Sequence, residues 1–131
     1  MFKSLLIALD LSPASICLLR CVGPLRGVGA ESATLLHVMD IRNVGGLYAS
    51  MKNFIEPLLK EKEKQLGEMG FRTRLEIPMG APAFEINRVA RETDASLIVV
   101  GTHGESLAKE FLLGSVSHRS TIPVLVVPGS L

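Results

Sequence analysis

The sequence predicts a single α/β domain, residues 1–131, in which helices cover both faces of a five-stranded parallel sheet. Short apolar segments alternate with segments of helical periodicity, which gives the element order β-α-β-α-β-α-β-α-β. Two of the short segments, Leu5–Leu9 and Leu97–Val100, are apolar throughout, as is typical of strands buried on both faces. The length of 131 residues and the hydrophobic content of 47% fit one packed domain.

The composition argues against several classes of protein. Fourteen basic residues oppose thirteen acidic ones, so the chain lacks the excess of positive charge that is typical of nucleic-acid binders. Aromatic residues make up 5% and Trp is absent, which disfavours a base-stacking platform. The apolar runs have the length of strands, too short to span a membrane, and the N-terminus does not resemble a secretory signal. We therefore expect a cytoplasmic protein that binds neither nucleic acid nor membrane.

The first strand is expected to lead directly into a helix. Ser12–Pro13 suits the N-cap and the first helical position, and apolar residues then recur at helical spacing over residues 16–25. Gly27 and Gly29 are expected to end this helix. A second strand is predicted at Ala33–Val38, and its His37 is interpreted as a packed or backbone-bonded histidine.

The middle of the chain is predicted to contain a loop, a long helix and a strand. Residues 40–53 show no clear period and contain Gly45–Gly46, which favours a mobile excursion. A helix is expected from Phe54, and Gly70 is expected to close it. Its apolar face is predicted to comprise Ile55, Leu58, Leu59, Leu66 and Met69. Phe71–Ile77 then alternates apolar and charged residues, which predicts a half-exposed strand.

The last third of the chain is predicted to alternate in the same way. A third helix starts at Gly80–Pro82 and has Ile86, Val89 and Ala90 on its apolar face. The strand Leu97–Val100 follows, and after it a glycine-bearing segment over residues 101–114. A short helix is expected from near Ser115, before a fifth strand within Pro123–Pro128.

The polarity of the strands predicts their order in the sheet. The charged third strand suits an edge, whereas the apolar first and fourth strands suit the centre, so we predict the order 3-2-1-4-5. This order places a topological switch point between the first and fourth strands, and ligands of such folds bind at the carboxyl ends of the strands there. Those ends are Asp10 and Gly101.

The residues after the fourth strand suit a phosphate ligand. Gly101 and Gly104 allow the backbone to turn sharply and to approach a ligand closely, so that its N–H groups can bind an anion. Gly114 directly precedes the expected start of a helix, where N–H groups are also exposed. Ser115 and Ser117 add hydroxyl donors. No Lys completes a Walker loop, so this is not a P-loop of the usual kind. The alternative is that the glycines only punctuate a long loop.

Over nearly its whole length the sequence resembles the universal stress protein family. The segments that carry the resemblance are Leu5–Ser12, Leu36–Val38, Gly80–Ala83, Leu97–Gly104, Leu112–Ser117 and Pro123–Val127. ATP-binding members contain the motif Gly-x2-Gly-x9-Gly-Ser/Thr, which Gly101, Gly104, Gly114 and Ser115 match without a gap. The resemblance implies a Rossmann-like or flavodoxin-like architecture of the adenine nucleotide alpha hydrolase-like type, with ATP as the ligand.

The resemblance also implies which residues bind ATP. Asp10 and the backbone of Val38 would lie at the adenine, and Val100 and Gly101 at the ribose. The phosphates would contact Gly104, Gly114, Ser115, Val116 and Ser117. Alternatively, Val38 and Val100 are plain core residues and Asp10 caps the following helix. No residue is assigned as catalytic or as a metal ligand; Mg²⁺ is left open as a companion of ATP.

The chain departs from the family near its C-terminal end. Only five residues separate Ser117 from Pro123, so the last helix should be about one turn shorter than is usual, which affects affinity more than location. The predicted function is that of an ATP-binding universal stress protein, a regulatory or protective module with little or no turnover. The alternatives are a slow ATP hydrolase and a stress-response interaction protein that does not bind ATP.

The fifth strand predicts a homodimer. Its residues Val124, Leu125, Val126 and Val127 are apolar on both faces, although the predicted order places the strand at an edge. A bare apolar edge favours pairing with another chain, here with an antiparallel copy of itself, and the family resemblance also favours this.

Overall fold

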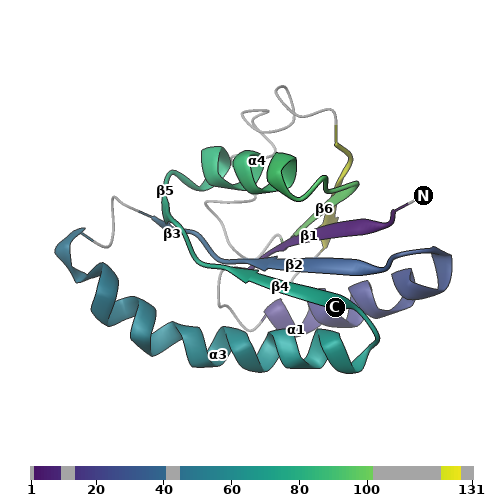
Figure 1. The fold of residues 1–131 in the computed structure, drawn as a ribbon, viewed down its shortest axis with the longest axis horizontal. Coiled ribbons are helices and arrows are strands. Elements are labelled where there is room, and N and C mark those ends of the chain that lie inside the picture. Colours follow the sequence, from purple (N-terminus) through teal and green to yellow (C-terminus); the bar gives the residue numbers. More distant parts are fainter. Residues whose placement is uncertain (1, 10–13, 41–44, 102–121, 128–131) are drawn as a thin grey trace.

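The computed structural model describes residues 2–9, 14–40, 45–101 and 122–127 (Figure 1). In this part of the chain, five parallel strands form one sheet in the order β4-β2-β1-β6-β7. These strands are β1 (Ser4–Ala8), β2 (Ser32–Leu36), β4 (Arg72–Glu76), β6 (Leu97–Gly101) and β7 (Val124–Val127). Taken in chain order, they have the predicted arrangement 3-2-1-4-5, which is confirmed.

Helices cover both faces of the sheet, as predicted (Figure 1). The helices are α1 (Ala14–Val22), α3 (Tyr48–Glu68) and α4 (Pro82–Glu92). On one face α1 and α3 pack against Leu5, Ile7 and Leu35, and on the other α4 packs against Leu6 and Leu36. No helix in the described ranges is long and apolar enough to cross a membrane.

Burial along the strands follows the predicted polarity. Leu5, Leu6 and Ile7 of β1 are fully buried, as are Ile98 and Val99 of β6, because each of these central strands has neighbours on both sides and helices on both faces. At the edge, the first three residues of β4 are exposed. Charged β4 and apolar β6 therefore lie where their compositions predict.

The long helix α3 begins earlier than the sequence predicts. It starts at Tyr48 after a 3-10 turn, Gly45–Leu47, so the prediction of a mobile excursion is wrong for residues 45–53. A tertiary contact explains the early start, because the Tyr48 hydroxyl donates to the Ile77 carbonyl at 3.0 Å. A local contact adds to it: the Lys52 ammonium, one turn further along α3, lies 5.7 Å from the centre of the Tyr48 ring. The contact to Ile77 fixes the first turn of α3 to the segment that follows β4.

The face that α3 buries is also narrower than predicted. Ile55, Leu59 and Leu66 are buried, whereas Leu58 and Met69 are 50% and 39% exposed. Gly70 does close the helix region, with a φ of 102° that favours glycine.

The first helical segment reaches Gly29, as predicted, but its second part is not α-helical. Its α-helical part stops at Val22 and a 3-10 helix, Gly23–Val28, continues to Gly29, which has a φ of 107°. Pro24 has no N–H to donate to the preceding turn, which accounts for the change at Gly23. The predicted cap at Ser12–Pro13 and the short helix near Ser115 lie outside the described residues.

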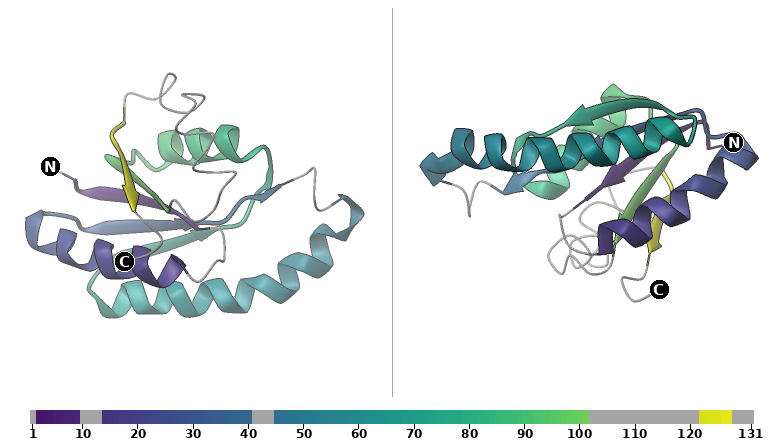
Figure 2. Two further views of the ribbon diagram at one scale, coloured as in Figure 1. Left: turned by 180° about the vertical axis from the view of Figure 1, so that it is seen from behind. Right: turned by 90° about the horizontal axis from the view of Figure 1, so that it is seen from below.

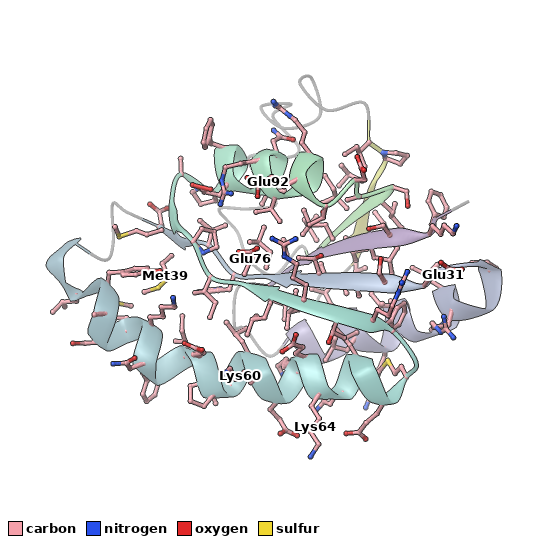
Figure 3. All side chains as sticks on the ribbon, in the orientation of Figure 1. Glu31, Met39, Lys60, Lys64, Glu76 and Glu92 are labelled. Atoms are coloured by element: carbon pink, nitrogen blue, oxygen red, sulfur yellow. The ribbon has the colours of Figure 1, made fainter. Side chains whose placement is uncertain are left out.

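Two short strands form a second, two-stranded sheet beyond the carboxyl ends of β2 and β4, and they were not predicted. They are β3 (Met39–Asp40) and β5 (Met79–Gly80), which pair in parallel beyond β2 and β4. The side chain of Met39 is 2% exposed and extends toward α3 (Figure 3). This pair therefore packs α3 against the end of the sheet.

Candidate functional site

The switch point lies where the sequence predicts it, between β1 and β6. The two strands are paired, and Ala8 is in register with Val100 at their carboxyl ends. From β1 the chain continues to β2 on one side, whereas from β6 it continues to β7 on the other, as Figure 2 shows. A crevice outside these carboxyl ends is the usual ligand site of an open α/β sheet.

The backbone of Val38 presents free polar groups at this edge. The N–H groups of His37 and Met39 donate to the carbonyls of Glu76 and Pro78, at 3.1 and 2.8 Å, on the β4 side. Because peptide groups alternate along an extended segment, the N–H and C=O of Val38 point to the opposite side, past the end of β1. Neither group of Val38 forms a hydrogen bond within the described part of the chain. A donor and an acceptor are thus presented side by side.

The His37 side chain links the segment after β2 to the end of β1. Its ring nitrogen Nδ1 lies 2.8 Å from the Leu9 carbonyl, and since a carbonyl only accepts, Nδ1–H is the donor. Leu9 in turn donates its N–H to the Leu36 carbonyl at 2.8 Å. His37 was predicted to be packed or backbone-bonded, and this is confirmed. It fixes the spacing between the end of β1 and the free groups of Val38, which makes it a positioning residue that the motif analysis missed.

Three of the predicted site residues fall in the described part of the chain. Val38 is partly buried and packs against the cluster below α4, and Val100 is fully buried in that cluster, so Val100 can offer a ligand only its backbone. Gly101 is the last residue of β6. All three lie at the carboxyl edge of the sheet. The remaining predicted residues, Asp10, Gly104, Gly114, Ser115, Val116 and Ser117, lie outside the described residues.

The described part of the site offers hydrogen bonds rather than metal ligands. Among the described residues, no three His, Cys, Asp or Glu side chains lie together so that they could hold a metal ion. The groups that face the edge from Val38 are neutral amide and carbonyl groups, which suit a planar ligand with an adjacent donor and acceptor.

The strand order defines an open parallel α/β protein with a topological switch point between β1 and β6. The chain belongs to the universal stress protein family, whose model matches residues 1–128. It is 33% identical to the universal stress protein MJ0577 of Methanocaldococcus jannaschii over 155 residues, which covers 97% of this chain and 95% of that protein. It is also 33% identical to the universal stress protein YxiE of Bacillus subtilis over 147 residues, covering 97% and 99% of the two chains.

Solved structures show the same architecture. The structure of MJ0577 superposes with a TM-score of 0.85 at 28% identity and covers 98% of this chain and 96% of that chain. Two more distant structures share the fold: a universal stress protein in complex with cAMP, at 22% identity and a TM-score of 0.70, and one from Archaeoglobus fulgidus in complex with dAMP, at 17% and 0.69. They cover 98% and 97% of this chain and 98% and 99% of their own chains.

Proposed function

We propose that this protein binds an adenine nucleotide, ATP, at the carboxyl edge of β1 and β6. The observation that supports this most directly is the free N–H and C=O of Val38. The Watson–Crick edge of adenine has an acceptor, N1, beside a donor, the N6 amino group, and one residue's N–H and C=O can pair with both. A backbone donor and acceptor that have no partner among the described residues can be satisfied by such a ligand or by water.

The family and its structures support the same class of ligand. The two distant structures hold cAMP and dAMP, which share an adenine and one phosphate. ATP rather than a monophosphate is favoured by the match of Gly101, Gly104, Gly114 and Ser115 to the motif of ATP-binding members. On this proposal Val116 and Ser117 add phosphate contacts, and Asp10 lies near the adenine. Mg²⁺ would screen the phosphate charge.

The role that fits this binding is regulatory. We infer a cytoplasmic stress-response module whose interactions depend on whether ATP is bound.

The Val38 assignment is tested by removing its N–H alone. Val38→Pro deletes the donor, and the extended backbone at His37 is what proline requires of the preceding residue. We expect ATP affinity to fall about tenfold, since an unpaired adenine nitrogen costs about 1–3 kcal/mol. Calorimetric titration with ATP measures this, and Val38→Ala, which keeps the N–H, is the control. Equal affinities in the two variants would contradict the assignment.

The phosphate assignment is tested at the third glycine of the motif. Gly114→Val places a branched side chain where the phosphates are expected to approach the backbone, so we expect at least a tenfold loss of ATP affinity, about 1.4 kcal/mol. The control is Lys60→Val on the outer face of α3, where Lys60 is 64% exposed and pairs with Glu56 at 3.3 Å. Unchanged affinity in a folded Gly114→Val protein, measured by the same titration, removes Gly114 from the site.

We further propose that the protein is a homodimer that pairs through β7. The two edges of the sheet differ: β4 exposes Arg72 and Arg74, charges that discourage pairing, whereas β7 is apolar and its Leu125 is 38% exposed. The carbonyl of Pro123 accepts from the Ile98 N–H, so by alternation the peptide groups of Val124 and Val126 point away from β6. These groups are available to an antiparallel copy.

A further inference from the structure

A stripe of exposed apolar side chains starts at Leu47, the residue just before α3, and runs along the first half of that helix. Leu47, Met51, Phe54 and Leu58 are 62%, 40%, 76% and 50% exposed. They follow one another at spacings of four, three and four residues, so they lie on one side of the helix, about a quarter turn from the buried Ile55. This stripe is separate from the face that α3 packs on the sheet.

The stripe is accessible to another helix. The first half of α3 extends past the carboxyl ends of β2 and β4, and in both Figure 1 and Figure 2 no other described element lies along it on the outside. The spacing of its residues is that of the apolar seam of a coiled coil, in which the side chains of one helix pack between those of another. The stripe therefore fits an apolar helix rather than an extended peptide.

The spacing also indicates that the helix that packs on the stripe is a second copy of α3. The order four, three, four is the same in both directions, so two antiparallel copies of α3 can match it across a two-fold axis between Met51 and Phe54. Leu47 then faces Leu58 of the second copy, and Met51 faces Phe54 of the second copy, a pairing in which sulfur meets an aromatic ring. Such self-matching is what a two-fold interface requires.

The charges of α3 are compatible with this pairing. On the outer flank of the stripe lie the uncharged and exposed Ser50, Asn53 and Pro57. The charged Glu56 and Lys60 lie on the far side of the helix and pair with each other at 3.3 Å. Two copies of the stripe thus meet without bringing like charges together.

We propose that two copies of this chain associate through antiparallel α3 helices along Leu47, Met51, Phe54 and Leu58. This interface goes beyond the proposed nucleotide binding and is distinct from the β7 edge. About three turns of one helix face bury on the order of 400 Å² per copy, roughly half of a standard interface. The association is therefore weak and depends on concentration, and it joins chains or β7-paired dimers into larger assemblies.

Sedimentation velocity between about 10 µM and about 1 mM, a range suited to a weak interface, tests the proposal. It is run on the full chain with and without Leu125→Arg, which removes any β7 pairing. We expect the sedimentation coefficient to rise with concentration in both backgrounds, and Phe54→Glu to weaken this association at least tenfold. Asn53→Glu adds the same charge one residue away, outside the stripe, and should leave it unchanged. A wild-type chain without this rise, or equal effects of the two variants, overturns the proposal.

Disulfide trapping tests the antiparallel pairing itself. Position 47 directly precedes α3 and position 58 lies in its third turn, so the two are about 16 Å apart in one chain, too far for an internal disulfide. Leu47→Cys combined with Leu58→Cys should therefore give a covalent dimer on mild oxidation, whereas each single variant should give only the background of the native cysteines. Cross-linking of a single variant as strongly as the double variant contradicts the antiparallel arrangement. Neither experiment involves ATP, so their outcome is independent of the nucleotide proposal.

Discussion

Leu125→Arg is expected to convert the proposed β7 homodimer into monomers at micromolar concentration. Leu125 is 38% exposed on the edge strand, in register with Val99 of β6, so an arginine there can remain solvated in a single folded chain. In an antiparallel pair of these four-residue strands, each arginine would be brought into the apolar seam, and the two like charges would lie within a few residues of each other. We expect the dissociation constant to rise at least a hundredfold, about 2.7 kcal/mol.

Sedimentation equilibrium on both proteins measures this change. The matched control is Thr73→Arg, which places the same charge on β4 at the opposite edge, where Thr73 is exposed beside Arg72 and Arg74. It should leave the dimer intact. A wild-type protein that is monomeric at micromolar concentration, or a Leu125→Arg variant that still forms the same dimer, refutes pairing through β7.

The sheet could be predicted because its strands differ in polarity. Leu5–Leu9 and Leu97–Val100 contain no polar residue, and only a central position buries both faces of a strand in this way. The charges of Arg72, Arg74 and Glu76 fit only an edge. Once these positions were set, the switch point and its carboxyl ends followed from topology alone.

The elements that were missed depend on contacts between distant residues. The first two turns of α3 have a single core-facing apolar side chain, Tyr48, which packs partly buried against the core. Its bond to Ile77 fixes the start of the helix, and no local pattern signals that bond. The short pair β3 and β5 exists because β2 and β4 continue side by side past the main sheet, where Met39 donates to Pro78 at 2.8 Å. Two residues on each strand are too few for a periodic signal.

The candidate site was predictable in location but not in detail. The strand order placed Val38 and Gly101 at the carboxyl edge of the sheet. The direction in which Val38 presents its N–H and C=O depends instead on which neighbouring segment His37 and Met39 bond. The orientation of the His37 ring could not be predicted either, because its bond to the Leu9 carbonyl joins the segments that follow the neighbouring strands β2 and β1. A sequence shows that successive residues of a strand alternate in direction. It does not show which neighbouring strand the N–H and C=O of a given residue face, because that depends on the register of the sheet.

ATP turnover is expected to be far slower than the roughly 1–100 s⁻¹ typical of kinases. Efficient phosphoryl transfer requires a positioned nucleophile, cations on the phosphates and an Arg or Lys on the transferred group. The matched motif supplies glycines and hydroxyls, which bind phosphate without activating water. Asp10 is expected at the adenine, too far from the γ-phosphate to act as a base.

The sequence provides few other candidates near the expected phosphates. Glu105 and Glu110 lie between the glycines, where a carboxylate weakens triphosphate binding unless a metal ion bridges the two. His103 is the one plausible base in this segment, and Lys109 and Arg119 are the nearby cations. None of these residues has a neighbour in sequence that would fix its geometry, and all of them lie outside the described residues.

A protein that binds ATP and keeps it can act as a sensor, because its state then follows the nucleotide supply rather than its own turnover. Phosphate release from the purified protein with Mg²⁺ and ATP measures the difference. His103→Ala is the paired variant, since it removes the single candidate base, and we expect both proteins to release phosphate at the same very low rate. A wild-type rate near one per second that collapses in His103→Ala would instead make the protein an ATP hydrolase, with ATP as its substrate rather than its resident ligand.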